Sequence, residues 1–260
     1  MTNWSLFPPR TREAQMDEKW SFVRRKQANC GREDSPEDAW QGDCWDHVAF
    51  DPEHRLVVSV VPGKRTVSNL VKLVRDFKRR TGERIMDLIT TDEYPAYEGA
   101  ILEAYGHRVV PLPQCKPGRR ALPYRVPPKK LTYATVHKTR KNGRVVKVEP
   151  KLVFGTAEGL TAALERSRCS RAVNTAFIER QNGTDRNRNA RKVRQTYCFS
   201  KDWKVHEAVT YFTMYSYNFC WPVRTLRESG RIRTPAMAAG LADRIWSIKD
   251  WITFPAIQSG

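Results

Sequence analysis

The stretch Ile85-Met86-Asp87-Leu88-Ile89-Thr90-Thr91-Asp92-Glu93-Tyr94-Pro95-Ala96-Tyr97 predicts a buried strand over residues 85–91 that stops at an acidic residue. Residues 95–105 then show a helical pattern that stops at Gly106. Sites in α/β sheets form at the carboxyl ends of strands, which makes Asp92 a candidate site residue. The alternative is that Asp92 only caps the following helix, because Asp is a preferred N-cap residue.

The segments around this strand predict an α/β fold with a mixed sheet flanked by helices. Residues 15–23 predict a strand, and residues 44–50 and 56–61 predict a hairpin. Apolar residues at helical spacing predict a helix over 67–80. Three strands, a helix, a strand and another helix form an α/β order. Further helical patterns cover residues 157–168, 175–193 and 203–219.

Two more acidic residues stand in settings that suit a site. Asp17 lies within a strand-like alternation, although it can equally be a surface residue of an edge strand. Glu179 lies in the predicted helix 175–193, where Asn182 and Arg186 share its face by the i, i+3, i+7 rule. The alternative for that face is a solvated, salt-bridged surface. Two carboxylates on strands and one on a helix can converge on two Mg²⁺ ions and support displacement at phosphate.

Charge and composition indicate the kind of partner. The chain of 260 residues has 46 Lys and Arg against 28 Asp and Glu, a net charge of +18. Such an excess favours a polyanion, and nucleic acid is preferred to a membrane because no basic amphipathic anchor helix stands out. No apolar run is long enough for a membrane span, and the N-terminus does not look like a signal peptide. Six scattered cysteines suit a reducing cytosol better than zinc or disulfides.

Basic residues concentrate in two segments. Residues 107–151 hold thirteen basic residues and one acidic residue, with a hairpin turn at Asn142-Gly143, and predict a basic insertion lobe outside the core. Residues 180–194 form an arginine-rich face that suits phosphate, or alternatively a solvated helix. The DNA-binding candidates are Arg180, Asn182, Arg186, Arg188, Arg191, Lys192, Arg194, Lys129, Lys130 and Lys141.

Two other residues have less specific roles. Asp46 is the most plausible substitute acid, because a neighbouring strand can bring it close to Asp17. His206 is expected to be structural or to support the site from behind, since the five histidines show no metal-ligand spacing. The aromatic residues of 211–221 are expected to pack in the core rather than to stack on bases.

At its acidic motifs the chain resembles the DDE transposases of bacterial insertion sequences, most of all those of the small insertion-sequence-one type. The resemblance covers roughly residues 15–250. The matching stretches are Met16-Asp17-Glu18-Lys19-Trp20-Ser21-Phe22, Thr90-Thr91-Asp92-Glu93-Tyr94-Pro95-Ala96-Tyr97, Phe177-Ile178-Glu179-Arg180-Gln181-Asn182-Gly183-Thr184-Asp185-Arg186, Thr196-Tyr197-Cys198-Phe199-Ser200-Lys201, Tyr217-Asn218-Phe219 and Thr234-Pro235-Ala236-Met237-Ala238-Ala239-Gly240-Leu241.

The resemblance implies an RNase H-like fold and a catalytic triad of Asp17, Asp92 and Glu179 that binds two Mg²⁺ ions, for which Mn²⁺ can substitute. It implies DNA cleavage followed by strand transfer. The partners would be double-stranded DNA, both element ends and target, with a homo-oligomer at synapsis and no membrane. The implied location is the bacterial cytoplasm, at the nucleoid.

The expected organisation has five parts. They are an N-terminal arm (1–14), the first part of the catalytic domain (15–106), the basic insertion lobe (107–156), a second catalytic part carrying Glu179 (157–222) and a C-terminal tail (223–260). Related transposases carry a helix-turn-helix or zinc-binding region ahead of the first Asp, whereas sixteen residues precede Asp17 here. We therefore expect either a separate DNA-binding subunit or frame-fused N-terminal domain, or a truncated copy.

Two alternative functions stay open at this point. An RNase H-like nuclease would use the same triad but would hydrolyse without joining ends. A catalytically inactive, basic DNA-binding fragment of a transposase would bind DNA with a steep salt dependence and show no metal-dependent chemistry.

Overall fold

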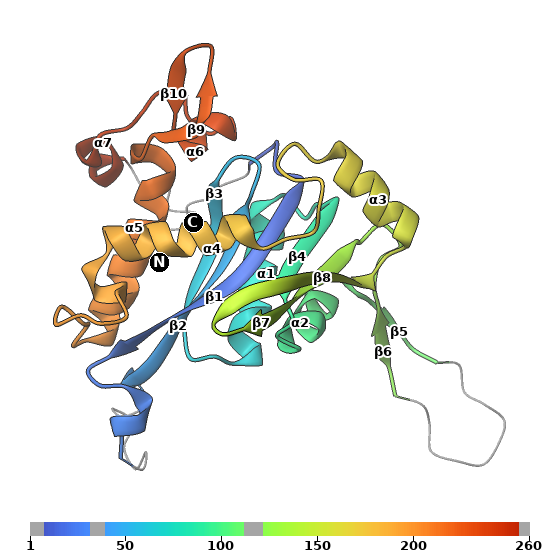
Figure 1. Ribbon diagram of the computed structural model, residues 1–260, viewed down its shortest axis with the longest axis horizontal. Helices are drawn as coiled ribbons and strands as arrows, with labels where there is room; N and C mark the ends of the chain where they lie inside the picture. Colours follow the sequence, from blue (N-terminus) through green and yellow to red (C-terminus); the bar gives the residue numbers. More distant parts are fainter. Residues whose placement is uncertain (1–7, 32–39, 112–121, 255–260) are drawn as a thin grey trace.

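A six-stranded mixed sheet forms the centre of the computed structural model, which describes residues 8–31, 40–111 and 122–254 (Figure 1). The strand order is β3-β2-β1-β4-β7-β8. Strands β1, β4 and β7 are parallel, and the remaining pairs are antiparallel. The predicted α/β class with a mixed sheet is therefore confirmed. The strands are β1 (Glu13–Val23), β2 (Gly42–Asp51), β3 (Leu56–Gly63), β4 (Leu88–Asp92), β7 (Tyr133–Lys141) and β8 (Arg144–Phe154).

Helices cover both faces of the sheet. On one face, α1 (Val67–Arg80) and α2 (Ala96–Tyr105) bury a core that includes Met16 and Tyr97. On the other face, α4 (Ala176–Arg188) and α5 (Trp203–Cys220) bury a second core. Side chains of a strand alternate between faces, so β1 supplies Met16 to the first core and the polar Asp17 to the side of α4. The prediction of helix 67–80 agrees with α1.

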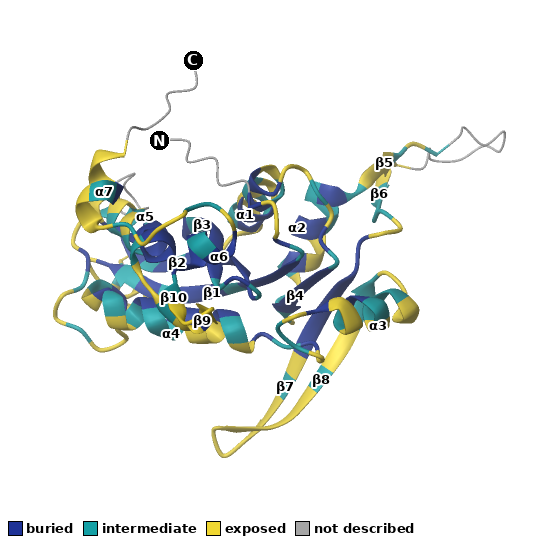
Figure 2. Cartoon of the chain, turned by 90° about the horizontal axis from the view of Figure 1, so that it is seen from above, coloured by how far each residue is buried: buried dark blue, intermediate teal, exposed yellow. Residues whose placement is uncertain are grey.

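The predicted lobe at residues 107–156 is wrong in part, because β7 and β8 belong to the main sheet. Tyr133 and Ala134 are buried, and β7 pairs in parallel with β4. Residues 131–136 carry hydrophobic or β-branched side chains on both faces, as suits a strand inside a sheet. Only the outer half of the β7–β8 hairpin projects from the body (Figure 2). Strands β5 (His107–Val109) and β6 (Tyr124–Val126) form a small sheet of their own.

The remaining elements complete the second layer. Helix α3 (Ala157–Arg166) packs Ala163 against Val136 of β7. The predicted helix 175–193 is shorter, because α4 ends at Arg188 and a short 3-10 helix, η3 (Ala190–Lys192), follows. No helix in the described part of the chain is long and apolar enough to cross a bilayer. A short 3-10 helix, η1 (Gln27–Asn29), follows β1. The C-terminal part folds as a hairpin, β9 (Val223–Glu228) and β10 (Arg231–Arg233), and two short helices, α6 (Pro235–Ala238) and α7 (Ile248–Thr253).

The edge strand β3 is closed by a side chain of α5. Asn218 accepts a hydrogen bond from the Val57 amide at 3.0 Å and donates one to the Val57 carbonyl at 2.8 Å. It therefore takes the place that a further strand would occupy. Pro62, near the end of β3, has no amide hydrogen to offer. Both features reduce pairing with another chain at this edge.

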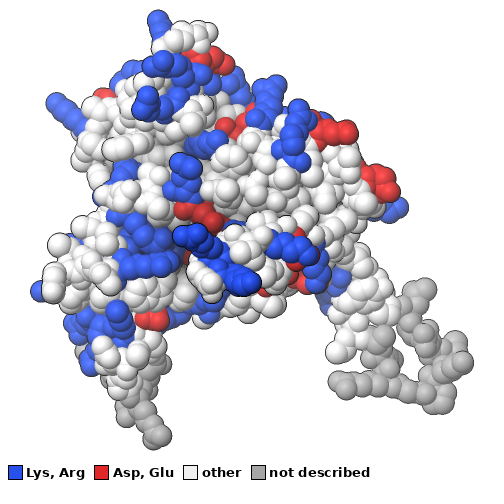
Figure 3. All heavy atoms as spheres, in the orientation of Figure 1, with Lys and Arg blue, Asp and Glu red and all other residues white. Residues whose placement is uncertain are grey.

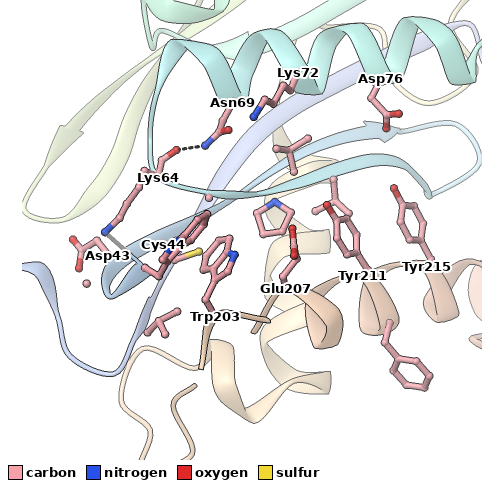
Figure 4. Close-up of a pocket in the computed structure, with 18 of the residues that line it drawn as sticks. Asp43, Cys44, Lys64, Asn69, Lys72, Asp76, Trp203, Glu207, Tyr211 and Tyr215 are labelled. Carbon is pink, nitrogen blue, oxygen red and sulfur yellow. Dashed lines mark hydrogen bonds between the residues drawn. The ribbon is translucent and has the colours of Figure 1, made fainter. Parts of the chain in front are cut away.

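A groove of about 1060 Å³ lies beside this edge, between α1 and α5 (Figure 4). Figure 4 shows Lys72 and Asp76 of α1 facing Tyr211 and Tyr215 of α5. Its charged residues nearly balance, with four Lys and Arg (64, 72, 79, 80) against three Asp and Glu (43, 76, 207). None of the predicted catalytic acids lines this groove, so it is separate from the predicted catalytic site.

Candidate active site

Two of the predicted acids lie side by side where β1 and β4 run in parallel. Met16 is the register partner of Thr91, so the next residues along the two strands are Asp17 and Asp92. Carboxylate oxygens of Asp17, Glu18 and Asp92 lie within 4.8 Å of one another. We call these three residues the acidic cluster. The parallel register therefore brings together two acids that are 75 positions apart in the sequence.

Glu18 is the member of the acidic cluster that the sequence analysis missed. As the neighbour of Asp17 on a strand, Glu18 has a side chain that points to the opposite face. Asp92 stands at the last position of β4, where its carboxylate can reach both faces of β1. The Glu18 carboxylate accepts a hydrogen bond from Arg65 at 3.3 Å, and the Arg65 guanidinium lies 3.9 Å from the centre of the Tyr94 ring. The signal in the sequence was the tandem of two acids in one strand.

The electrostatics of the acidic cluster favour a cation. Burial and then the nearby Asp92 raise the pKa of Asp17 from 3.8 to about 6. The same two causes, in the same order, raise the pKa of Glu18 from 4.5 to about 7, although Arg65 opposes them. Asp17 is oriented by hydrogen bonds from the Glu18 amide and from the Asn182 Nδ2, each 2.8 Å long. The cluster therefore holds its negative charge at a cost that a cation would offset.

Glu179 lies beside the acidic cluster but is held by other partners. It stands in the first turn of α4, and its charge contributes to the raised pKa of Asp17. Its Oε1 accepts hydrogen bonds from Thr175 Oγ1 at 2.7 Å and from the ammonium of Lys138 on β7. The side chain is half exposed, and its oxygens do not belong to the set that lies within 4.8 Å. The structure thus brings Glu179 near Asp17 with a lysine on its carboxylate.

Alternate residues of β1 fix the position of α4. Gln15 donates to the Asn174 carbonyl at 2.7 Å and accepts from the Ile178 amide at 3.0 Å. Two positions further on, Asp17 contacts Asn182, and after another two Lys19 pairs with Asp185. Each step along the strand meets a later part of the helix. This seam sets where α4 presents Glu179.

A buried network of charged side chains lies behind the seam, and Asp46 is part of it. Asp46 is opposite Lys19 in the β1–β2 register. The prediction that Asp46 lies close to Asp17 is therefore wrong. The Asp46 carboxylate lies 3.3 Å from Lys19 Nζ and 2.8 Å from Lys192 Nζ. Burial by itself would raise the pKa of Asp46, but these two ammonium groups hold it well below its usual range. Asp46 is therefore a structural acid.

His206 belongs to the same network, which fits its predicted structural or supporting role. Its Nε2 lies 2.8 Å from Lys192 Nζ and its Nδ1 lies 2.8 Å from Ser200 Oγ. Burial and the neighbouring Lys192 lower its pKa to about 4, so the imidazole is neutral. Cys44, Asp46 and His206 have metal-like spacing, but the ammonium groups of Lys19 and Lys192 already balance the charge of Asp46. This group therefore does not suit a metal.

Two of the predicted DNA-binding residues are buried instead. Lys192 is 1% exposed and pairs with Asp46, so it is not placed to contact a phosphate. Its neighbours in the sequence gave no sign of this partner, which lies on β2. Asn182 is 4% exposed and orients Asp17 through its Nδ2. Both predictions are corrected for the same reason, since one side of α4 and η3 faces the sheet.

The other predicted residues divide between half-buried and exposed positions. Arg188 donates to the Thr213 carbonyl at 2.9 Å and lies over the Trp221 ring. Arg186 is half-buried, and burial followed by the nearby Arg194 lowers its pKa. Its Nε is buried with no hydrogen-bond partner in the described part of the chain. Arg191 is half-buried, and the exposed ones are Arg180, Arg194, Lys129, Lys130 and Lys141.

The residues present suit a divalent cation. Carboxylate oxygens are the ligands that Mg²⁺ and Mn²⁺ prefer, and the acidic cluster supplies three such groups. Asn182 Oδ1 is buried without a hydrogen-bond partner among the described residues, next to Asp17. This oxygen is a sign, separate from the spacing of the acids, that points to a positively charged ligand.

Comparisons with protein families and with curated proteins give no match to this chain. The resemblance to insertion-sequence transposases therefore stays a prediction.

Proposed function

We propose that this chain is a metal-dependent enzyme that cuts and joins DNA, with an RNase H-like catalytic domain and the site of a DDE transposase. The observation that carries the proposal is the proximity of Asp17, within β1, to Asp92, at the end of the parallel strand β4, with Glu179 on the helix packed against β1. The antiparallel strands β3, β2 and β1, followed by the parallel strands β4 and β7, are compatible with an RNase H-like sheet.

The chain offers one group of ligands for each of two ions. The acidic cluster would hold one Mg²⁺ or Mn²⁺, and Glu179 with Asp17 would hold the second. Two such ions, when bound, activate a water or a DNA 3′-hydroxyl and stabilise the leaving oxygen. Asn182 keeps the Asp17 carboxylate in one orientation, and Arg65 does the same for Glu18.

Basic residues beside the acids would hold the DNA backbone. The half-buried Arg186 lies near Asp17, and Arg194 is exposed close to it. Guanidinium groups suit phosphate oxygens because they can donate two parallel hydrogen bonds. Figure 3 shows Lys and Arg side chains distributed over the face that carries α4, which agrees with the net charge of +18. We infer that a duplex crosses this face.

The experiment compares Asp92→Asn with Asp87→Asn on plasmid and linear DNA with Mg²⁺ or Mn²⁺. Asp87 lies just before the same strand but is outside the acidic cluster, so it controls for the loss of one negative charge. We expect Asp92→Asn to lose both nicking and joining of 3′-hydroxyl ends while it stays folded, and Asp87→Asn to keep both.

Each rival function has its own result in this experiment. Metal-dependent nicking without joining would favour the RNase H-like nuclease. DNA binding without metal-dependent chemistry by the wild-type protein would favour the inactive fragment. Full activity of Asp92→Asn would show that the site is wrongly assigned.

A further inference from the structure

The outer half of the β7–β8 hairpin is a two-stranded ribbon that is exposed on both faces. From His137 to Glu149 nearly every residue is exposed or half-exposed, and the ribbon stands clear of the body (Figure 2). Val146 and Val148 are 58% and 48% exposed. An isolated hairpin is marginally stable in water, so a ribbon of this length with bare valines suits a surface that is covered in a complex.

The charge of the ribbon indicates what covers it. Residues 138–151 carry six Lys and Arg and one acidic residue, Glu149. In the described part of the chain, Arg140, Lys141 and Arg144 at the tip take part in no ion pair. Three unpaired cations beside bare valines fit a polyanion that also offers apolar contacts.

Strand addition by a second copy of the chain fits less well. In the projecting half both edges of the ribbon are free, because β7 pairs with β4 only as far as Val136, and Lys138 and Lys141 lie on the β7 edge. Lys147 and Lys151 also lie on β8, and lysines on an edge strand oppose pairing between chains. A second basic ribbon would in addition repel the first.

We propose that this ribbon binds duplex DNA by entering the major groove beside the acidic cluster. The major groove is about 12 Å wide and admits a two-stranded β-ribbon, where thymine methyl groups offer apolar contacts. Val136 is level with Asp92 in the β4–β7 register, and the turn at Asn142 lies six residues further on. At about 3.3 Å per residue the tip reaches about 20 Å past the acidic cluster. That length corresponds to about six base pairs.

The base of the ribbon is anchored to the site itself. Lys138 donates to Glu179 and to Thr175, and His137 pairs with Glu93, the residue after Asp92. A duplex held by the ribbon would therefore lie with one side over the acidic cluster. The position of the duplex over the acidic cluster rests on the proposed function. Binding of the ribbon to the duplex does not, because it requires no metal.

The test measures binding of fluorescent 30-base-pair duplexes in EDTA at several salt concentrations. The variant Arg140→Gln/Lys141→Gln/Arg144→Gln removes three charges from the tip. Its matched control, Arg224→Gln/Arg227→Gln/Arg231→Gln, removes three charges from the other exposed hairpin, β9–β10. We expect the tip variant to bind about tenfold or more weakly and to lose about 2 to 3 from its salt slope, with a much smaller effect in the control. An equal loss in both variants would overturn the proposal, because binding would then follow net charge.

A second variant tests entry into the groove. Val146→Thr/Val148→Thr keeps the charge and the β-branched shape of the ribbon. We expect it to bind the duplex about two- to fivefold more weakly with an unchanged salt slope, because only apolar contacts are lost. An unchanged affinity would overturn groove entry. Binding is measured in EDTA and nicking with Mg²⁺ or Mn²⁺, so failure of the proposed chemistry is distinguishable from failure of the ribbon.

Discussion

Replacing Glu18 by glutamine is expected to stabilise the metal-free protein at neutral pH. Burial and the proximity of Asp92 raise the pKa of Glu18 from 4.5 to about 7. The folded protein therefore binds this proton more tightly than the unfolded chain, and wild-type stability falls as pH rises through that window. A difference of about 2.5 pKa units corresponds to about 3 kcal/mol. Glutamine has the shape of the protonated acid and carries no charge, so the variant avoids this cost.

The assay is unfolding by heat and by urea at pH 4.5 and pH 8, in EDTA. At pH 8 we expect Glu18→Gln to be more stable by up to about 3 kcal/mol. At that limit the melting temperature should rise by about 6 °C or more. At pH 4.5 the difference should be much smaller, because Glu18 then carries its proton in the folded protein. Glu165→Gln, an exposed residue of α3, is the control and should change little at either pH.

In the same experiment, added magnesium should favour the stability of the wild type over that of Glu18→Gln. A metal that binds the acidic cluster stabilises the wild type by mass action, and it should raise the melting temperature of Glu18→Gln less. If Glu18→Gln is less stable than the wild type at pH 8, then the contact between Glu18 and Arg65 outweighs repulsion within the acidic cluster. That result would refute the account of the electrostatics.

Three further changes test the surroundings of the site. Lys138→Gln should strengthen Mn²⁺ binding by at most about fivefold, as measured by titration. The reason is that it frees Glu179 from an exposed ion pair worth at most about 1 kcal/mol. Weaker binding would mean that the lysine orients the carboxylate for the metal. Lys192→Met should cost about 3–5 kcal/mol in urea unfolding, since it leaves buried Asp46 with one cation fewer; a cost below about 1 kcal/mol would contradict the network. Asn218→Ala should cost about 1–3 kcal/mol and promote self-association in light scattering, because it uncovers the edge of β3; a fully stable monomer would argue against a capping role.

Local patterns predicted much of the sheet and its helices. The apolar run before Asp92 predicted a strand with an acid at its end, and β4 indeed ends at that residue. Helical spacing predicted residues 67–80, which form α1. These predictions succeeded because alternation and helical periodicity depend on neighbours within a few positions. The predicted lobe failed because its basic residues dominated the composition, although the strand at residues 131–136 was hydrophobic enough to join the sheet.

The sequence by itself determined the class of fold, the basic character and the two acids at Asp17 and Asp92, since each depends on composition or on a short pattern. Only the tertiary structure decided that Glu18 joins these acids and that Lys192 is buried. Both outcomes depend on which strands are neighbours and in what register. Lys192 finds Asp46 at a separation of 146 positions, and no local pattern carries that information. Contacts between distant segments form only when the whole sheet assembles, and they decide which charged groups lie inside and which face a partner.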